Sequence, residues 1–269
     1  MPLGLIWDSH NYSCAYDSLF TILRHMWQSN STYWTPILSD INSMTSSMVL
    51  GFQMQTSGLA SFEMVRNDIR AALHRLDSQK FPYGPALISM EDLASRFLQT
   101  DQPISTKRRL CLNCNWTDIN ITQETYSLLI GINATNTTSL KDWFSSPNER
   151  TRYACNACSV RNVVLHLELN TIPPFIYVDL QGRTEIEISP KINIPNISGV
   201  ETELFLEGII YYGENHFTCR MFSDTSVWFH DGILTGSNAY RESPTELRSM
   251  LHRGTTTAIG VIYVQRQTV

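Results

Sequence analysis

The stretch WDSHNYSCAYDSLF (residues 7–20) places Cys14 at the start of a predicted helix. The apolar residues that follow the cysteine recur every three or four positions, which is the spacing of one helix face: Leu19, Phe20, Ile22, Leu23, Met26 and Trp27. Asn11 or Ser13 is placed to cap this helix. The unpaired N–H groups at a helix N-terminus favour a negatively charged sulfur. Cys14 is therefore a candidate nucleophile.

Two later segments offer the other side chains that a nucleophilic thiolate requires. Residues 215–217 (Asn-His-Phe) supply a base in His216, and residues 228–231 (Trp-Phe-His-Asp) supply Asp231 to orient it. Asp224 competes with Asp231, but it lies in a predicted turn, which is a common position for aspartate. His10 is the main rival of His216 because it lies close to the cysteine in sequence. An isolated cysteine is more often a buried packing residue, whereas this combination favours a Cys-His-Asp site.

Four of the six cysteines form two C-x2-C pairs separated by forty residues: Cys111, Cys114, Cys155 and Cys158. This spacing is typical of a tetrahedral Zn²⁺ site, and a site with four protein ligands is structural rather than catalytic. Two disulfides are one alternative, and four unligated cysteines that share this spacing by coincidence are the other. The N-terminus lacks a basic segment followed by an apolar stretch, so we expect no signal peptide and a nuclear or cytoplasmic location, where disulfides are rare. Cys219, on a predicted strand, is expected to be a core residue.

The composition is that of a globular protein. The chain has 269 residues, of which 42% are hydrophobic and 17% charged, and a net charge of −5 with no long basic block. Nucleic acid is therefore not the expected main partner. No apolar run approaches the length of a membrane span, so no membrane partner is expected.

The order of the predicted elements indicates a single α+β domain in three parts. Residues 1–104 are expected to be helical, with helices over residues 61–76 and from Ser89 onward. Residues 105–162 would form a zinc-bearing finger that contains a strand near residues 126–132. Residues 163–269 are rich in strands, which are predicted at 163–169, 174–180, 204–212 and 258–264. The candidate site then lies in the cleft between the helical and the strand-rich parts.

The chain resembles the ubiquitin-specific protease superfamily. Residues 11–23 are similar to its cysteine box, residues 213–232 are similar to its histidine box, and the paired C-x2-C motifs lie where that family has its fingers. The resemblance implies a papain-like fold with a helical thumb, zinc-bearing β fingers and an antiparallel β palm. It also implies isopeptide hydrolysis by Cys14, His216 and Asp231, with Phe217 and Trp228 contacting the Gly-Gly tail of a ubiquitin-like protein.

Three details resemble the SUMO-directed branch of the superfamily: Trp7, Asp17 and the triplet at residues 215–217. They favour SUMO narrowly over ubiquitin as the modifier removed from lysine. A deubiquitinase of the same fold is the alternative. A catalytically silent module that binds a ubiquitin-like protein and a zinc-ribbon interaction module with an incidental cysteine also remain open.

One position departs from the pattern of the family. The family carries an asparagine five residues before the nucleophile, where it helps to form the oxyanion hole, and this chain has Ser9 there. The expected hole combines the backbone N–H of Cys14 with a side chain of Asn11, Ser9 or His10. A single oxyanion donor is worth roughly 2–4 kcal/mol of transition-state stabilisation, so this position bears directly on activity.

Overall fold

Five helices form the N-terminal part of the chain in the computed structural model, which describes residues 1–135 and 137–266. They are α1 (Cys14–Ser29), α2 (Ser31–Ser39), α3 (Ser43–Thr56), α4 (Phe62–Leu76) and α5 (Met90–Phe97). Helix α1 begins at Cys14, as predicted. Ser13 occupies the capping position, but its hydroxyl donates to the Asp17 carboxylate at 2.6 Å instead of capping the helix.

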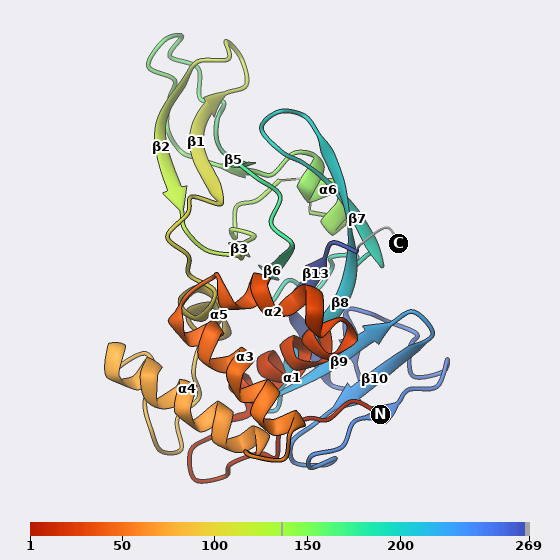
Figure 1. Ribbon diagram of the computed structural model, residues 1–269. Helices are drawn as coiled ribbons and strands as arrows, with labels where there is room; N and C mark the ends of the chain where they lie inside the picture. Colours follow the sequence, from red (N-terminus) through yellow and green to blue (C-terminus); the bar gives the residue numbers. More distant parts are fainter. Residues whose placement is uncertain (136, 267–269) are drawn as a thin grey trace.

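A four-stranded sheet extends away from these helices as the finger of the molecule (Figure 1). Its strand order is β2 (Thr117–Gln123), β1 (Ser105–Cys111), β5 (Val163–Leu169) and β4 (Asn148–Arg150), and all of its pairs are antiparallel. Strand β1 ends at Cys111 opposite Val163, the first residue of β5. This register brings the C-x2-C motif that follows β1 next to the motif that precedes β5.

The larger sheet is the palm, and it lies against α1 (Figure 1). Its main path is β11 (Tyr240–Arg241), β10 (Ser226–His230), β9 (His216–Ser223), β8 (Glu201–Gly213), β13 (Thr256–Val264), β6 (Phe175–Asp179) and β3 (Ser127–Leu129). In addition, β7 (Lys191–Pro195) pairs with β8, and β12 (His252–Arg253) pairs with β13. Only β3 runs parallel to its neighbour among these described strands. The short helix α6 (Leu140–Ser145) lies beside β7.

The predicted fold class is confirmed, but two strands belong to a different sheet from the one expected. The strand predicted near residues 126–132 is the shorter β3, which joins the palm. Strand β5, expected in the palm, pairs with β1 in the finger. The segment between the two cysteine motifs thus leaves the finger and returns to it, so the zinc motifs meet at the finger tip rather than clamping its two ends. Residue 136, within this segment, lies outside the described residues.

Helix α1 packs directly on the palm, and this contact positions the candidate site. A Cβ atom on Gly208 of β8 would lie 2.5 Å from the Ile22 side chain, so only glycine permits the helix to approach this closely. Cys219 of β9 is fully buried in the same core cluster, as predicted. Within the described part of the chain, no helix has the length and apolar character needed to cross a membrane.

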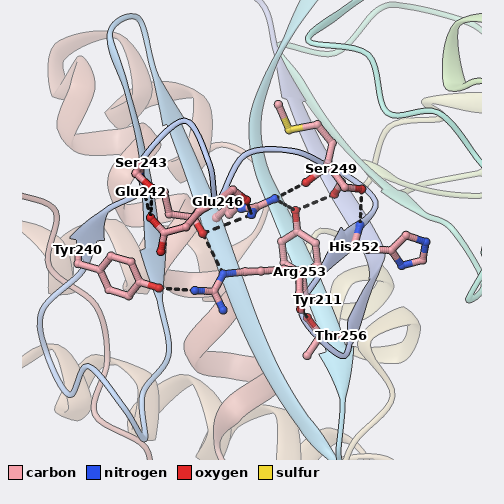
Figure 2. Close-up of polar contacts among 11 residues, drawn as sticks. Tyr211, Tyr240, Glu242, Ser243, Glu246, Ser249, His252, Arg253 and Thr256 are labelled. Atoms are coloured by element: carbon pink, nitrogen blue, oxygen red, sulfur yellow. Dashed lines mark hydrogen bonds and ion pairs between the residues drawn. The ribbon is translucent and has the colours of Figure 1, made fainter.

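A buried ion pair attaches the segment after β11 to the palm. Figure 2 shows its carboxylate, that of Glu242, with a second partner, Arg253. The side chains of Arg220 and Glu242 are both fully buried, with 2.5 Å between Nε and Oε2. Arg220 also donates to the Tyr211 hydroxyl and to the carbonyl oxygens of Glu246 and Ser249. Glu242 accepts a second guanidinium, that of Arg253, at 2.9 Å.

Removing the Glu242 carboxylate is expected to destabilise the fold strongly. In Glu242→Ala the Arg220 charge stays buried without its partner, so we expect the free energy of unfolding to fall by about 3–5 kcal/mol. Urea unfolding measures this change. The matched control is Glu203→Ala, which breaks the exposed Lys191–Glu203 pair and should cost less than about 1 kcal/mol. Equal losses in the two variants would contradict this account.

Candidate active site

Local structure brings the three predicted site residues to one place. Cys14 is the first residue of α1, His216 is the first residue of β9, and Asp231 directly follows β10, the neighbour of β9. The β8–β9 hairpin turns on two residues with positive φ, Glu214 (+54°) and Asn215 (+58°). A two-residue turn of this kind matches the twist of the paired strands. It fixes His216 at the end of the palm that faces the helix bearing Cys14.

Cys14 and His216 line a cleft of about 510 Å³ between the thumb and the palm. Its lining residues are Trp7, Tyr12, Cys14, Pro85, Leu87, Glu214, Asn215, His216 and Ile233. The Nε2 atom of His216 lies 2.9 Å from Oδ1 of Asp231. The bond to Asp231 occupies Nε2, so Nδ1 is the ring nitrogen left for the Cys14 sulfur, with which the imidazole also interacts. This is the order of contacts that a nucleophile, base and orienting acid require.

The surroundings of His216 favour its charged form. Burial of the ring lowers its pKa, but the hydrogen bonds and charges of Asp231 and Cys14 outweigh burial and raise the pKa to about 9. Burial acts to raise the pKa of Asp231. The hydrogen bond from His216 and those from the backbone N–H groups of Ile233 and Leu234 lower the pKa by more than burial raises it, so the net shift is downward. The carboxylate therefore stays ionised beside a protonated imidazole.

The rival residues are not part of this arrangement. Asp224 lies in the turn after β9, is 79% exposed and pairs with Arg266. His10 has a 92% exposed side chain near Asp8. Neither contributes to the lining of the cleft that contains Cys14.

The candidate oxyanion donors are not among the residues that line the cleft. The Asn11 side chain donates to Asp8 at 2.9 Å and accepts from the backbone N–H of Gly84 at 3.0 Å, so it ties the cysteine loop to the loop after α4. Of the described residues that line the cleft, none is Ser9, His10 or Asn11. A side-chain contribution of these three residues to an oxyanion hole stays a prediction, whereas the backbone N–H of Cys14 lies at the site itself.

Two residues that resembled the SUMO-directed branch have structural explanations here. Trp7 lies edge-on to His216, with ring centroids 6.3 Å apart and planes at 84°. Tyr12 lies beside Trp7 in the cleft and has a φ of +41°, which is unusual for a bulky residue. Asp17 is buried and forms an ion pair with Arg66 at 2.8 Å.

Sequence reasoning did not identify the residues that the loop after α4 contributes. Pro85 and Leu87 line the cleft, but in the sequence this loop is recognisable only as a Pro- and Gly-containing separator between two helices. Its approach to the cysteine depends on the long-range contact between Gly84 and Asn11.

The two predicted tail-binding residues have different positions. Phe217 packs on Tyr212, with ring centroids 4.7 Å apart, and lines a second cavity of about 410 Å³. This cavity shares Leu87 with the cleft that contains Cys14. Trp228 lies on β10 opposite Met221 and lines neither cavity. The structure thus brings Phe217, but not Trp228, to the neighbourhood of the cleft.

Asp231→Asn is expected to shift the titration of His216 to lower pH. The carboxylate stabilises the charged imidazolium, and asparagine carries no charge, so the pKa should fall from about 9 by roughly one to three units. NMR of histidine-labelled protein, with the His216 signal assigned by its loss in His216→Gln, measures the change. Asp224→Asn is the matched control and should leave the titration in place. An unchanged His216 titration in Asp231→Asn would contradict the pairing.

The four paired cysteines form a separate site at the finger tip. The ligand atoms of Cys111, Cys114, Cys155 and Cys158 all lie within 4.8 Å of one another. The Sγ–Sγ distances are 3.7 Å for Cys111–Cys158 and 3.6 Å for Cys114–Cys155. Four sulfur atoms that bind one Zn²⁺ in a tetrahedron are about 3.8 Å apart, whereas the two sulfur atoms of a disulfide are about 2.0 Å apart. All six cysteines of the chain are free.

The backbone of the two motifs supports the same conclusion. Each motif is followed by a residue with positive φ, Asn115 (+57°) or Ser159 (+61°). The N–H of that residue donates at 2.9 Å to the carbonyl of the first cysteine of the motif, Cys111 or Cys155. Two equivalent turns thus present four thiolates to one point. The tetrad is positioned as a closed, structural Zn²⁺ site.

No protein-family model matches the sequence, and no curated protein sequence matches it either. Among solved structures, the chain is similar to the SAGA Ubp8/Sgf11/Sus1/Sgf73 DUB module bound to ubiquitin aldehyde. The TM-score is 0.58 at 14% identity, with 98% of this chain and 70% of that chain covered. For the module with a Ubp8 variant bound to monoubiquitin, the TM-score is 0.53 at 13% identity, with 98% of this chain and 69% of that chain covered. For the yeast SAGA module with an Sgf73 mutant, the TM-score is 0.53 at 14% identity, with 98% of this chain and 68% of that chain covered. The chain therefore has the mixed α+β fold of Ubp8 in these modules, with a cysteine tetrad placed for zinc binding.

Proposed function

We propose that this chain is a cysteine isopeptidase that releases ubiquitin from lysine side chains. The observation that carries the proposal is that Cys14 and His216 line one cleft, with His216 bonded to Asp231 at 2.9 Å. A Cys-His-Asp arrangement generates a thiolate and supplies a proton donor for an amine leaving group.

Each of the three side chains has its own role in the proposed reaction. His216 holds the proton that the Cys14 thiol releases, and the sulfur attacks the carbonyl carbon of the C-terminal glycine of the modifier. His216 then gives the proton to the lysine nitrogen as the C–N bond breaks, which leaves a thioester. Water, deprotonated by His216, hydrolyses the thioester and restores the thiol. Asp231 holds the imidazole in orientation throughout. A zinc ion with four thiolate ligands has no open position, so it takes no part in these steps.

Ubiquitin replaces SUMO as the favoured modifier for two reasons. The solved structures with the same fold include modules bound to ubiquitin aldehyde and to monoubiquitin. Trp7 and Asp17, which favoured SUMO in the sequence, are explained by packing on His216 and by the Arg66 ion pair. The catalytically silent module and the zinc-ribbon module are less consistent with the structure, because neither gives a reason for the His216–Asp231 contact.

The cavity beside Phe217 is the proposed path of the ubiquitin tail. It is lined on the palm side by Tyr212, Phe217 and Ile259 and on the thumb side by Leu87. Because Leu87 also lines the cleft of Cys14, a tail lying in the cavity would lead directly to the sulfur. The cavity is also lined by polar side chains, among them Glu91, Asp179 and Gln181. A tail that ends in glycines would pass beside Phe217 and Leu87 without side chains of its own.

Hydrolysis of matched ubiquitin and SUMO conjugates tests the proposal. We expect release from the ubiquitin conjugate and much slower release from the SUMO conjugate. Changing the second-last glycine of the ubiquitin tail to alanine should lower kcat/KM by about 100-fold, because a misplaced carbonyl is attacked poorly. A substitution on the distal face of ubiquitin is the control and should have little effect. Faster release of SUMO would overturn the choice of modifier, and release of neither would overturn the hydrolase assignment.

A further inference from the structure

The N-terminal residues 2–7, here called the N-terminal strap, lie along the turn that carries Asp231. The N-terminus is beside β10 in Figure 1. Gly4 donates to the carbonyl of Ser237 at 2.9 Å, and Trp7 donates to the carbonyl of Gly232 at 3.2 Å. A Cβ atom on Gly232 would lie 2.8 Å from the Leu5 carbonyl oxygen and 2.9 Å from the Trp7 nitrogen. The strap and the residue next to Asp231 are thus in direct backbone contact.

Helix α4 holds the other side of the strap. Glu63 accepts from the Ile6 N–H at 3.2 Å, and Nη1 of Arg66 donates to the Ile6 carbonyl at 2.7 Å. The same nitrogen donates to Asp17 at 2.8 Å and to Ser13 at 3.2 Å. Arg66 is 3% exposed and Asp17 is 2% exposed. One buried nitrogen therefore connects the strap to the first turn of α1, which begins at Cys14.

We propose that Arg66 is a positioning residue, which fixes Cys14 relative to His216 and Asp231 by joining the start of α1 to the N-terminal strap. The path runs from Asp17 and Ser13 through Arg66 to Ile6, and then through Trp7 to Gly232. Trp7 also packs on His216. Arg66 lies outside the residues that line the cleft, so it acts through these contacts and not on the substrate.

The link affects the rate of the proposed reaction because it joins the two parts of the molecule that carry the reacting groups. The nucleophile comes from the thumb, whereas the base and its orienting acid come from the palm. A displacement of about 1 Å between reacting groups can cost on the order of 100-fold in rate. Contacts that fix the distance between the two parts therefore support the rate without contributing to binding.

Four variants test this inference, which rests on the proposed function for its kinetic readout. Arg66→Met removes the link, whereas Arg66→Lys keeps one nitrogen with three donors. Gly232→Ala pushes the strap away while leaving Arg66 paired. The matched control is Arg24→Met, because Arg24 is equally buried in the thumb but, among the described residues, its side chain donates hydrogen bonds only to Gln28 and Gln55. The measurements are kcat and KM on a ubiquitin conjugate and the His216 titration by NMR, each at a temperature where the variant is folded.

We expect kcat to fall by about 100-fold in Arg66→Met and Gly232→Ala, with KM near that of the wild type and the His216 titration at lower pH. Arg66→Lys should restore most of kcat, and Arg24→Met should change neither readout. Wild-type kcat and titration in the folded Arg66→Met and Gly232→Ala proteins would overturn the inference, as would an equal loss in Arg24→Met. If the wild type fails to cleave ubiquitin, the proposed function fails, and the His216 titration alone decides the role of Arg66.

Discussion

Cys14→Ala is expected to abolish hydrolysis of a ubiquitin conjugate while binding of ubiquitin persists. In the proposed reaction the sulfur forms the covalent bond to the modifier, and no other thiol lines the cleft among the described residues. Removing the nucleophile of such a triad typically costs on the order of 10⁴-fold or more in kcat. Alanine is smaller than cysteine and adds no polar group at this buried helix start, so the fold should be retained. Hydrolysis rates and calorimetric binding measure the two effects.

The control for this variant is Cys219→Ala. Cys219 is also fully buried and lies on β9 near the site, and burial raises the pKa of its thiol strongly. Its removal should reduce stability modestly and leave kcat close to that of the wild type. If Cys14→Ala retains appreciable activity, or if Cys219→Ala is the variant that loses it, then Cys14 is not the nucleophile.

The second large effect is expected at the finger tip. Replacing Cys155 with serine should remove the bound Zn²⁺ and unfold the finger, because metal binding contributes directly to the folding free energy of such sites, by about 10–16 kcal/mol in isolated zinc-binding peptides. Strands β1 and β5 meet at the tetrad through the Cys111–Val163 pair, so loss of the metal should spread along these strands. Elemental analysis measures zinc per chain, and amide hydrogen exchange measures protection of β1, β2 and β5.

The zinc content of control proteins and the amide protection of the palm strands serve as controls for Cys155→Ser. The wild type should contain one zinc per chain, and the Cys219→Ala protein should contain the same amount. The palm strands β8 and β13 should keep their protection in Cys155→Ser, because they belong to a separate sheet. Wild-type protein without zinc, or with the tetrad thiols paired as disulfides, would contradict the assignment.

The candidate site could be proposed from the sequence because its chemistry is local. Cys14 at a helix start, His216 after a two-residue turn and Asp231 after a strand are each recognisable from a few neighbouring residues. The zinc tetrad is recognisable for the same reason, since both motifs need only short, equivalent turns. A thiolate nucleophile and a tetrahedral metal site require particular residue types in particular spacings, and these requirements are visible without coordinates.

The sequence did not reveal that β3 belongs to the palm sheet and β5 to the finger sheet. Strand propensity and alternation give the presence of a strand, but its partner depends on long-range pairing. For β5 the deciding contact is with β1, whose paired residues lie 52 to 64 positions earlier in the chain. The part played by Arg66 was missed for the same reason. It is one of many arginines on helical patterns, and only folding brings it to Ile6, Ser13 and Asp17.

Reaction with ubiquitin carrying a C-terminal electrophile tests the central claim most directly. Intact-mass spectrometry should show one ubiquitin added per chain, and peptide mapping should place the bond on Cys14. His216→Gln should slow the labelling strongly, whereas Asp224→Asn should not. No adduct, or an adduct on an exposed finger cysteine such as Cys114 in place of Cys14, would contradict the assignment of this cleft as the active site of a ubiquitin isopeptidase.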